Sequence, residues 1–160
     1  MKSTYDAVVS SPDIYQIKMS ANQTDDRVVD GQRYASFRSD IPIPGYLIAI
    51  VAGDLVSVAV GPRTNVTSEP GFIKESAEAL ENLEYSLILA ETYTTPYIWG
   101  LYNIVIMPPS FPFGGMENPL LTFASPSIIT PDKSRIGVAD HEIGHSWTGN
   151  MVTNENWDCF

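Results

Sequence analysis

The stretch His141-Glu142-Ile143-Gly144-His145 contains both histidines of this 160-residue chain and predicts the element around which its second half folds. Two histidines four residues apart, with a glutamate directly after the first, form the pattern HExxH, which arises by chance in roughly one such chain in 1,500. On a helix, residues at this spacing lie on one face with their Cβ atoms about 6 Å apart. Two imidazoles can then reach one metal ion at about 2.1 Å each, so the stretch predicts a helix with a Zn²⁺ site at His141 and His145.

Glu142 has a different place on the same helix, about 100° around the axis from His141 and about 60° from His145. It flanks the metal-binding pair, and its carboxylate can take a proton from a metal-bound water molecule without itself binding the metal. Glu142 is therefore the candidate general base of a hydrolytic reaction. Such a site needs a third protein ligand. The spacing HExxHxxGxxH is excluded, because the chain has Thr148 and Met151 where Gly and His would stand.

The sequence next to this motif predicts further elements of the second half. A helix is expected from about residue 134 to 148, with Gly149-Asn150 as its stop signal. Its buried residues are expected to be Ile136, Ile143 and Trp147. Strands are expected at residues 102–107 and 120–124, because both are short apolar runs next to prolines.

A second helix is predicted earlier in the chain. Ser68-Glu69-Pro70 combines a capping hydroxyl, an acidic first turn and a proline, which is typical of a helix start. Apolar residues then recur every three or four positions, so one long helix with a single buried stripe is expected. The stripe consists of Ile73, Ala77, Leu80, Leu83, Leu87 and Ala90.

The first part of the chain is predicted to be β-structure. Residues 3–60 form short apolar runs rich in β-branched and aromatic residues, with turn signals between them. Residues 46–60 are almost continuously apolar except at Gly53-Asp54, which favours two neighbouring buried strands joined there. Gly61-Pro62-Arg63 breaks the pattern. We therefore expect an α+β protein with a domain boundary between residues 60 and 61.

Composition excludes several classes of partner. Nine Lys and Arg residues against nineteen Asp and Glu residues give a net charge of −10, so a nucleic-acid partner is not expected. The longest uncharged stretch, residues 41–53, is shorter than the roughly 18 apolar residues of a spanning helix, and no membrane span is expected. A single cysteine, Cys159, cannot form an internal disulfide, which is compatible with a reducing compartment. The first residues lead into no apolar run of signal-peptide length, so a cytoplasmic location is expected.

The sequences of the HExxH region and of a second motif resemble those of the M1 family of zinc aminopeptidases. The first match continues from HExxH through Ser146-Trp147-Thr148-Gly149-Asn150 to Val152-Thr153-Asn154 and Trp157. The second is Gly114-Gly115-Met116-Glu117-Asn118, which is similar to the family's GxMEN exopeptidase motif. Four further segments resemble the leukotriene A4 hydrolase branch of that family. They are residues 42–49, 61–64, 108–112 and 145–150.

This resemblance implies a fold and a missing part. The implied fold is the end of an N-terminal β saddle domain, at residues 1–60, followed by the first part of a thermolysin-like metallopeptidase domain, at residues 61–160. The family's third zinc ligand is a Glu nineteen residues after the second His, which would be position 164, whereas the chain ends at Phe160. The resemblance therefore implies that the chain is a fragment of a longer parent protein.

The resemblance also implies roles for individual residues. His141 and His145 would hold one Zn²⁺ per parent chain, and Glu142 would be catalytic. Gly114-Gly115 leaves bare backbone on which an extended peptide can form main-chain hydrogen bonds, and Glu117 can pair with the peptide's free α-ammonium group. The expected substrate-binding residues are Pro112, Phe113, Gly114, Gly115, Met116 and Glu117. Phe113 stands where the leukotriene A4 hydrolase branch commonly has Tyr, which removes a hydroxyl from the substrate pocket.

Three functions follow from these residues. The leading one is hydrolysis of the N-terminal peptide bond of peptides with a free N-terminus. The second keeps the fold and the zinc site but opens a lipid epoxide, as the namesake of the branch does. The third is an inactive fragment or pseudoenzyme that lacks the third zinc ligand, and it is the function expected of the 160 residues alone, because a site one ligand short binds its metal weakly.

Overall fold

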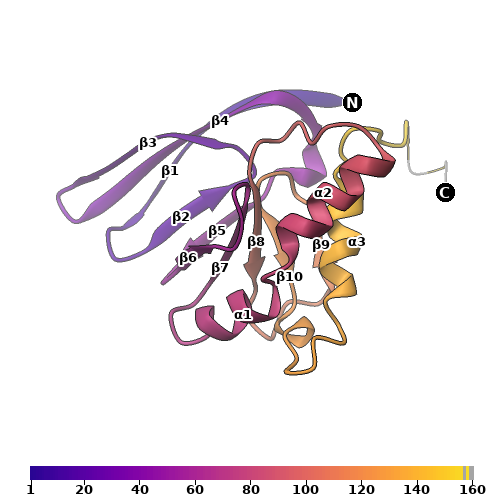
Figure 1. The fold of residues 1–160 in the computed structure, drawn as a ribbon. Helices are drawn as coiled ribbons and strands as arrows, with labels where there is room; N and C mark the ends of the chain where they lie inside the picture. Colours follow the sequence, from indigo (N-terminus) through magenta and orange to yellow (C-terminus); the bar gives the residue numbers. More distant parts are fainter. Residues whose placement is uncertain (157, 159–160) are drawn as a thin grey trace.

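The computed structural model describes residues 1–156 and 158. Trp157 of the HExxH-region match and the single cysteine Cys159 lie outside the described residues, as does Phe160. The described residues form three sheets, with α1 and α2 between β7 and β8 and α3 after β10 (Figure 1). The prediction of a mixed α+β protein is confirmed.

Two of the sheets come from the first part of the chain. β1 (Lys2–Pro12), β4 (Gln32–Pro44) and β3 (Asn22–Val29) form an antiparallel sheet in the order β1-β4-β3. β2 (Gln16–Met19) pairs with β5 (Ile50–Gly53) in a separate antiparallel ribbon. Alternate side chains of the ribbon and the larger sheet meet in a small apolar core. Its buried members are Ile17, Met19, Ala21, Ala35 and Phe37.

The third sheet has five strands in the order β6-β7-β8-β10-β9. β7 (Thr64–Ser68), β8 (Tyr102–Ile106) and β10 (Thr122–Ala124) are parallel neighbours, while β6 (Val56–Ala59) and β9 (Gly115–Met116) run antiparallel at the two edges. The strands predicted at residues 102–107 and 120–124 are thus confirmed in shortened form. The predicted domain boundary falls in the connection between β6 and β7, which are hydrogen-bonded to each other in this sheet.

The prediction of two neighbouring buried strands in residues 46–60 was wrong. The segment begins with a 3-10 turn, η1 (Gly45–Leu47), and then forms β5 and β6, which pair with β2 and β7 and not with each other. All four residues of β6 are exposed, and β5 alternates between exposed and half-buried residues. The chain passes from one sheet to another at residues 54 and 55, and an apolar run does not specify which partner each strand takes.

The prediction of one long helix was also wrong, because the segment forms two helices, α1 (Ile73–Ala79) and α2 (Leu83–Tyr93). Ser68 does not cap a helix, since it ends β7 and its hydroxyl donates to the Glu69 carbonyl. Between the helices the Leu83 N–H donates to the Leu80 carbonyl at 3.1 Å, which forms a turn. The break keeps the apolar stripe on one side, and its buried members are Leu80, Leu83 and Leu87.

α3 (Gly137–His145) is shorter than the helix predicted for residues 134–148. Its beginning is delayed because Ser134 is bound in a loop, where its N–H and hydroxyl both donate to the Asp132 carboxylate. α2 and α3 pack beside each other, as Figure 1 shows. A second 3-10 turn, η2 (Pro126–Ile128), precedes α3 in the chain.

The main core lies between the three helices and one face of the five-stranded sheet. β8 alternates as a strand buried on both faces does: Tyr102, Ile104 and Ile106 pack against helical residues, whereas Val105 packs on the other face with Leu121. Ile143 and Trp147 are buried in the helical core, which confirms their predicted side, while Ile136 is half-buried. This core holds α3 against the sheet next to β9.

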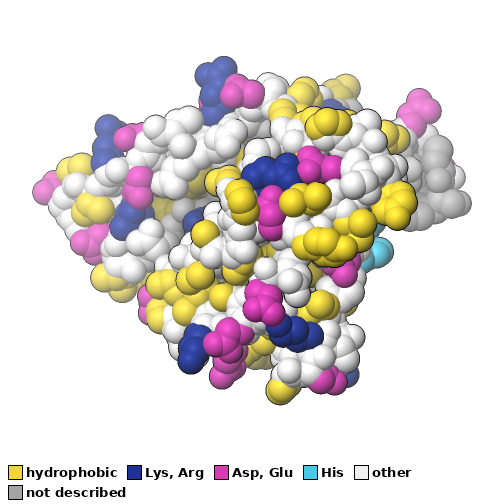
Figure 2. Space-filling model, in the orientation of Figure 1, with side chains coloured by type: hydrophobic (Ala, Val, Ile, Leu, Met, Phe, Trp, Pro, Cys, Tyr) yellow, Lys and Arg dark blue, Asp and Glu magenta, His cyan; other side chains and the backbone are white. Residues whose placement is uncertain are grey.

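On the face shown in Figure 2, charges of both signs are mixed. In Figure 2 the Lys and Arg side chains are interspersed with Asp and Glu side chains, and hydrophobic side chains gather over α2. The exposed apolar residues of α2 are Tyr85, Ile88, Leu89 and Tyr93. Within the described part of the chain, no helix is both long and apolar enough to cross a membrane.

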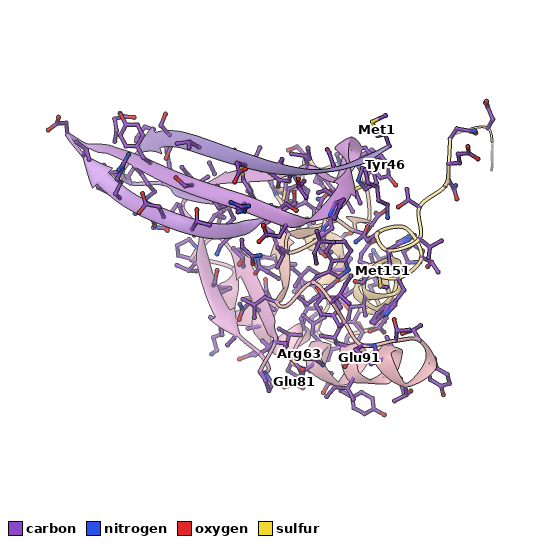
Figure 3. The ribbon with its side chains drawn as sticks, turned by 90° about the horizontal axis from the view of Figure 1, so that it is seen from above. Met1, Tyr46, Arg63, Glu81, Glu91 and Met151 are labelled. Atoms are coloured by element: carbon purple, nitrogen blue, oxygen red, sulfur yellow. The ribbon has the colours of Figure 1, made fainter. Side chains whose placement is uncertain are left out.

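Arg63 joins the β6–β7 connection to α2 through two carboxylates. Its guanidinium donates to both oxygens of Glu91, at 3.0 and 2.8 Å, and its Nε donates to Glu84 at 3.0 Å (Figure 3). The Tyr97 N–H also donates to Glu91, at 2.7 Å. The hydrogen bonds from Arg63 and then from Tyr97 lower the pKa of Glu91 to about 2. The ionised form of Glu91 is therefore stabilised in the folded state.

We expect Glu91→Gln to lower the free energy of unfolding by about 1–2 kcal/mol at pH 7, a value reduced because the pair is partly solvated. The folded pKa of Glu91 lies below its ordinary value of 4.5, so its contribution is present above about pH 4.5 and is lost as pH falls toward 2. Urea denaturation at pH 7 and pH 3 measures the effect. Glu75→Gln, at an exposed position of α1, is the matched control, and a difference that does not shrink at pH 3 contradicts the assignment.

Candidate active site and metal site

Buried anchors on either side fix the orientation of α3. Ala139 and Ile143 face the core with 1% exposure each. Just beyond the helix, the Trp147 indole N–H donates to the Thr95 carbonyl at 2.9 Å, and the Trp99 indole N–H donates to the Ser146 carbonyl at 3.1 Å. With these side chains buried, the opposite side of the helix presents His141 and His145 outward.

The two histidines converge as the HExxH spacing predicts. Their Nε2 atoms are 2.9 Å apart, and the ring planes are nearly perpendicular, at 88°. Two imidazoles on one tetrahedral Zn²⁺, with bonds of about 2.1 Å, place their nitrogens about 3.4 Å apart. The two rings therefore need to move apart only slightly to bind one ion between their Nε2 atoms. Imidazole nitrogens are also donor atoms that suit zinc.

His145 is held in the tautomer that a metal ligand needs. Its Nδ1 lies 2.8 Å from the Thr148 carbonyl oxygen. A carbonyl can only accept, so Nδ1 carries the proton and Nε2 keeps its lone pair for a metal. Gly149 permits this close approach: its φ is +137°, and a Cβ there would lie 3.1 Å from Nδ1 of His145.

Glu142 lies on the inner side of the histidine pair and is 5% exposed. Its carboxylate packs directly against the backbone of Gly115 in β9, and a Cβ at residue 115 would overlap it. Burial raises the pKa of Glu142 to about 7, the nearby negative charge of Glu117 adds to this, and His145 opposes it. A carboxylate in this environment can both accept and release a proton near neutral pH.

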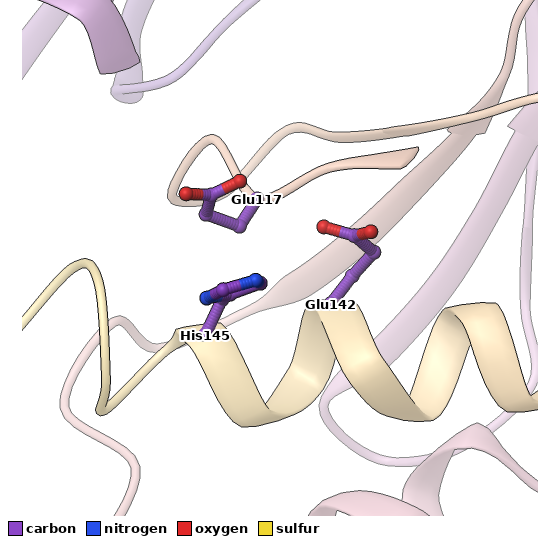
Figure 4. A group of neighbouring side chains, drawn as sticks. All are labelled: Glu117, Glu142 and His145. Carbon is purple, nitrogen blue, oxygen red and sulfur yellow. The ribbon is translucent and has the colours of Figure 1, made fainter. Parts of the chain in front are cut away.

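Glu117 of the Gly-Gly-Met-Glu-Asn motif lies close to the HExxH motif. Ligand atoms of Glu117, Glu142 and His145 all lie within 4.8 Å of one another, and Figure 4 shows the two carboxylates and the imidazole turned toward a common space. Glu117 follows β9 directly and is half-buried. The fold thus places one carboxylate from the sheet edge and one from α3 around the second histidine.

The other residues predicted to bind substrate lie along the same sheet edge. Gly115 and Met116 form β9 and pair with Ala124 and Phe123 of β10. The Gly114 carbonyl accepts a hydrogen bond from the Ser125 N–H at 2.9 Å. Phe113 is 62% exposed, and Pro112 is exposed as well. Because β9 is an edge strand, an extended peptide can add beside it.

Two residues near the site were not predicted from the sequence. The Asn150 side chain donates from Nδ2 to the Glu117 carbonyl at 2.8 Å, whereas the sequence pattern assigned Asn150 no role beyond a helix stop and a place in the family match. Tyr46 in η1 lies near Glu117: burial raises the pKa of Tyr46, and the Glu117 charge adds to that shift. No sequence signal links Tyr46 to the site. The burial of Asn150 is visible only in the structure, and its place after a helix gives no sequence signal for the contact with Glu117.

A match to a protein-family model identifies the family of the chain. Residues 78–160 match the Peptidase family M1 domain. The chain belongs to peptidase family M1. Within that family it falls in the leukotriene A4 hydrolase and aminopeptidase B branch, to which the following relatives belong.

Three relatives show the extent of the similarity. The chain is 47% identical to Aminopeptidase B of Rattus norvegicus, 43% identical to Leukotriene A-4 hydrolase of Xenopus laevis and 41% identical to Leucine aminopeptidase 2 of Pyricularia oryzae. Each match covers 100% of the chain but only 24%, 27% and 26% of the relative. The chain therefore spans about a quarter of the length of these relatives.

Solved structures agree with the fold. The chain matches yeast LTA4 hydrolase in complex with bestatin with a TM-score of 0.89 at 40% identity, and native yeast LTA4 hydrolase with 0.90 at 39%. Both matches cover 98% of the chain and 24% of the yeast chain. The mixed α+β arrangement is thus that of a part of these enzymes.

Proposed function

We propose that the protein to which this chain belongs is a zinc-dependent aminopeptidase that hydrolyses the N-terminal peptide bond of peptides. One observation carries the proposal: Glu117 at the sheet edge faces Glu142 and His145 on α3, with ligand atoms within 4.8 Å of one another. This arrangement sets a candidate base and a candidate metal ligand beside a group suited to bind a free amine. Similarity to aminopeptidase B and leucine aminopeptidase 2 supports it.

We also propose a finer description of the fold. Residues 1–60 would be the C-terminal part of a β-rich saddle domain, and residues 61–160 the first part of a thermolysin-like metallopeptidase domain. The separate sheets of β1-β4-β3 and β2-β5 support the first assignment, and the packing of α2 and α3 on a mixed sheet supports the second. The pairing of β6 with β7 means that the last strand before the boundary joins the sheet of the second part.

His141 and His145 would hold the zinc ion, together with the third ligand that the resemblance puts at position 164. When bound, zinc polarises the scissile carbonyl and lowers the pKa of water toward about 7. Glu142 accepts the proton of the attacking water and delivers it to the nitrogen of the leaving peptide. Its contact with Gly115 holds the carboxylate beside the sheet edge on which the substrate lies.

Glu117 gives the site its preference for the end of a peptide. Its carboxylate binds the α-ammonium group of the first residue by charge-assisted hydrogen bonds. The backbone of Gly114 and Gly115 holds the next residues of the substrate peptide as an added strand. Pro112, Phe113 and Met116 flank these two glycines in the sequence. Because only a free N-terminus supplies the ammonium group, cleavage is limited to the first peptide bond.

Paired substrates test this proposal in the full-length protein. We expect turnover of an aminoacyl amide with a free α-amine, and at least about 100-fold lower kcat/KM for the N-acetylated form, because acetylation removes the charge that Glu117 binds. The rate of amide hydrolysis is measured from the amount of product released. Equal rates on both forms, or no hydrolysis of either, contradict the proposal.

A second candidate is hydrolysis of a lipid epoxide on the same zinc site. The 43% identity to Leukotriene A-4 hydrolase of Xenopus laevis is the observation that favours it. Assaying the same protein with the epoxide of that enzyme's name separates the two reactions. Diol formation without amide hydrolysis would replace the first proposal, and both activities together would extend it.

Two smaller proposals concern the chain itself. Residues 1–160 alone would bind zinc weakly and have negligible turnover, because the set of ligands would be incomplete. A cytoplasmic location is proposed on the single cysteine, Cys159.

A further inference from the structure

Lys2, the first residue of β1, reaches the far end of the chain. Its Nζ donates to the Asn150 carbonyl at 2.7 Å and to the Met151 carbonyl at 2.8 Å. These bonds place the beginning of β1 beside the segment that follows α3, as Figure 1 shows. Lys2 is half-buried, and burial lowers its pKa.

The turn that Lys2 contacts holds both parts of the candidate active site. The Asn150 N–H donates to the His145 carbonyl at 3.0 Å, and its side chain donates to the Glu117 carbonyl at 2.8 Å. Asn150 is 1% exposed. One buried residue therefore connects the last residue of α3 with the residue that follows β9.

Apolar packing also links this turn to the N-terminal strands. Met151 and Met116 pack at the rim of one apolar cluster, whose buried members are Ile43, Leu47 and Trp99. Apolar contacts of this kind resist separation but permit sliding, whereas a charged donor shared by two successive carbonyls fixes direction as well.

We propose that Lys2 is a positioning residue of the active site, which fixes the Asn150 turn and through it the placement of Glu117 relative to His145. The inference deepens the proposed aminopeptidase function and rests on it. Lys2 touches neither the substrate nor the metal site. Its loss should let Glu117 move with the turn, so binding of the α-ammonium group weakens more than the chemical step slows.

The test uses the full-length protein with Lys2→Met, Lys2→Arg and the control Lys18→Met, which changes a half-buried lysine of β2. For the free aminoacyl amide, Lys2→Met should raise KM about ten-fold while kcat changes less than about three-fold. Lys2→Arg should restore KM to within about three-fold, because a guanidinium can also donate to two carbonyls. Hydrogen exchange at residues 149–153 should accelerate about ten-fold in Lys2→Met, with zinc content and β8 exchange unchanged.

Each outcome decides the matter. An active wild type whose KM and hydrogen exchange are unaffected by Lys2→Met overturns the role of Lys2. So does a Lys2→Arg variant as impaired as Lys2→Met with the same loss of thermal stability, because the residue would then only support the fold. A wild type that hydrolyses no aminoacyl amide overturns the proposed function, and hydrogen exchange then decides alone whether Lys2 holds the turn.

Discussion

Glu142→Gln is expected to slow peptide-bond hydrolysis about 10³–10⁴-fold in the full-length protein while one zinc ion stays bound. Glutamine has nearly the same shape, so it fits the 5%-exposed site against Gly115. Its amide cannot accept a proton from water, and the attacking group then loses its base. His141 and His145 keep their convergent rings, so metal binding is retained. Steady-state kinetics and metal analysis by mass spectrometry measure both effects.

His145→Gln is the contrasting variant for this prediction. It removes one of the two nitrogens that face each other at 2.9 Å, so both zinc content and turnover should fall. Turnover of Glu142→Gln within about ten-fold of the wild type would mean that another group acts as the base. Loss of zinc in Glu142→Gln would mean that the carboxylate itself supports the metal.

The local geometry of the candidate site was predictable from the sequence because helical spacing is fixed by the backbone. Residues four apart on α3 must share a face, and His141 and His145 do. The position of Glu142 beside the pair followed from the same rotation. The meeting of Glu117 with His145 was not derivable from periodicity, since it depends on how β9 and α3 pack across 28 residues of chain. Only the family resemblance brought the two motifs together.

Other features could not be predicted because they depend on tertiary partners. The helix expected after Ser68 breaks at residues 80–82, yet Leu80, Leu83 and Leu87 all remain buried, so the apolar stripe alone fits one helix or two. β5 and β6 have similar composition but join different sheets. Asn150 is a further example, since a residue typical of a helix stop is here buried between Glu117 and Lys2.

Glu117→Gln is expected to remove the preference for a free N-terminus. The variant keeps the shape of the side chain but loses the charge that pairs with the α-ammonium group. We expect kcat/KM for the free aminoacyl amide to fall about 100-fold, the usual cost of losing one partner of a partly buried charge pair. The N-acetylated amide has no such charge, so its already low rate should stay within about three-fold. Kinetics on the two substrates measure the ratio directly.

The ratio of the two rates separates a binding role of Glu117 from a structural one. If Glu117 only supported the fold or the metal, its replacement would slow both substrates equally and the ratio would stay the same. Glu78→Gln, at an exposed position of α1, is the matched control and should leave both rates unchanged. A Glu117→Gln enzyme that still discriminates about 100-fold against the acetylated amide would assign recognition of the amino end to another group. Tyr46, which belongs to η1 and lies near the Glu117 charge, would then be the next residue to replace.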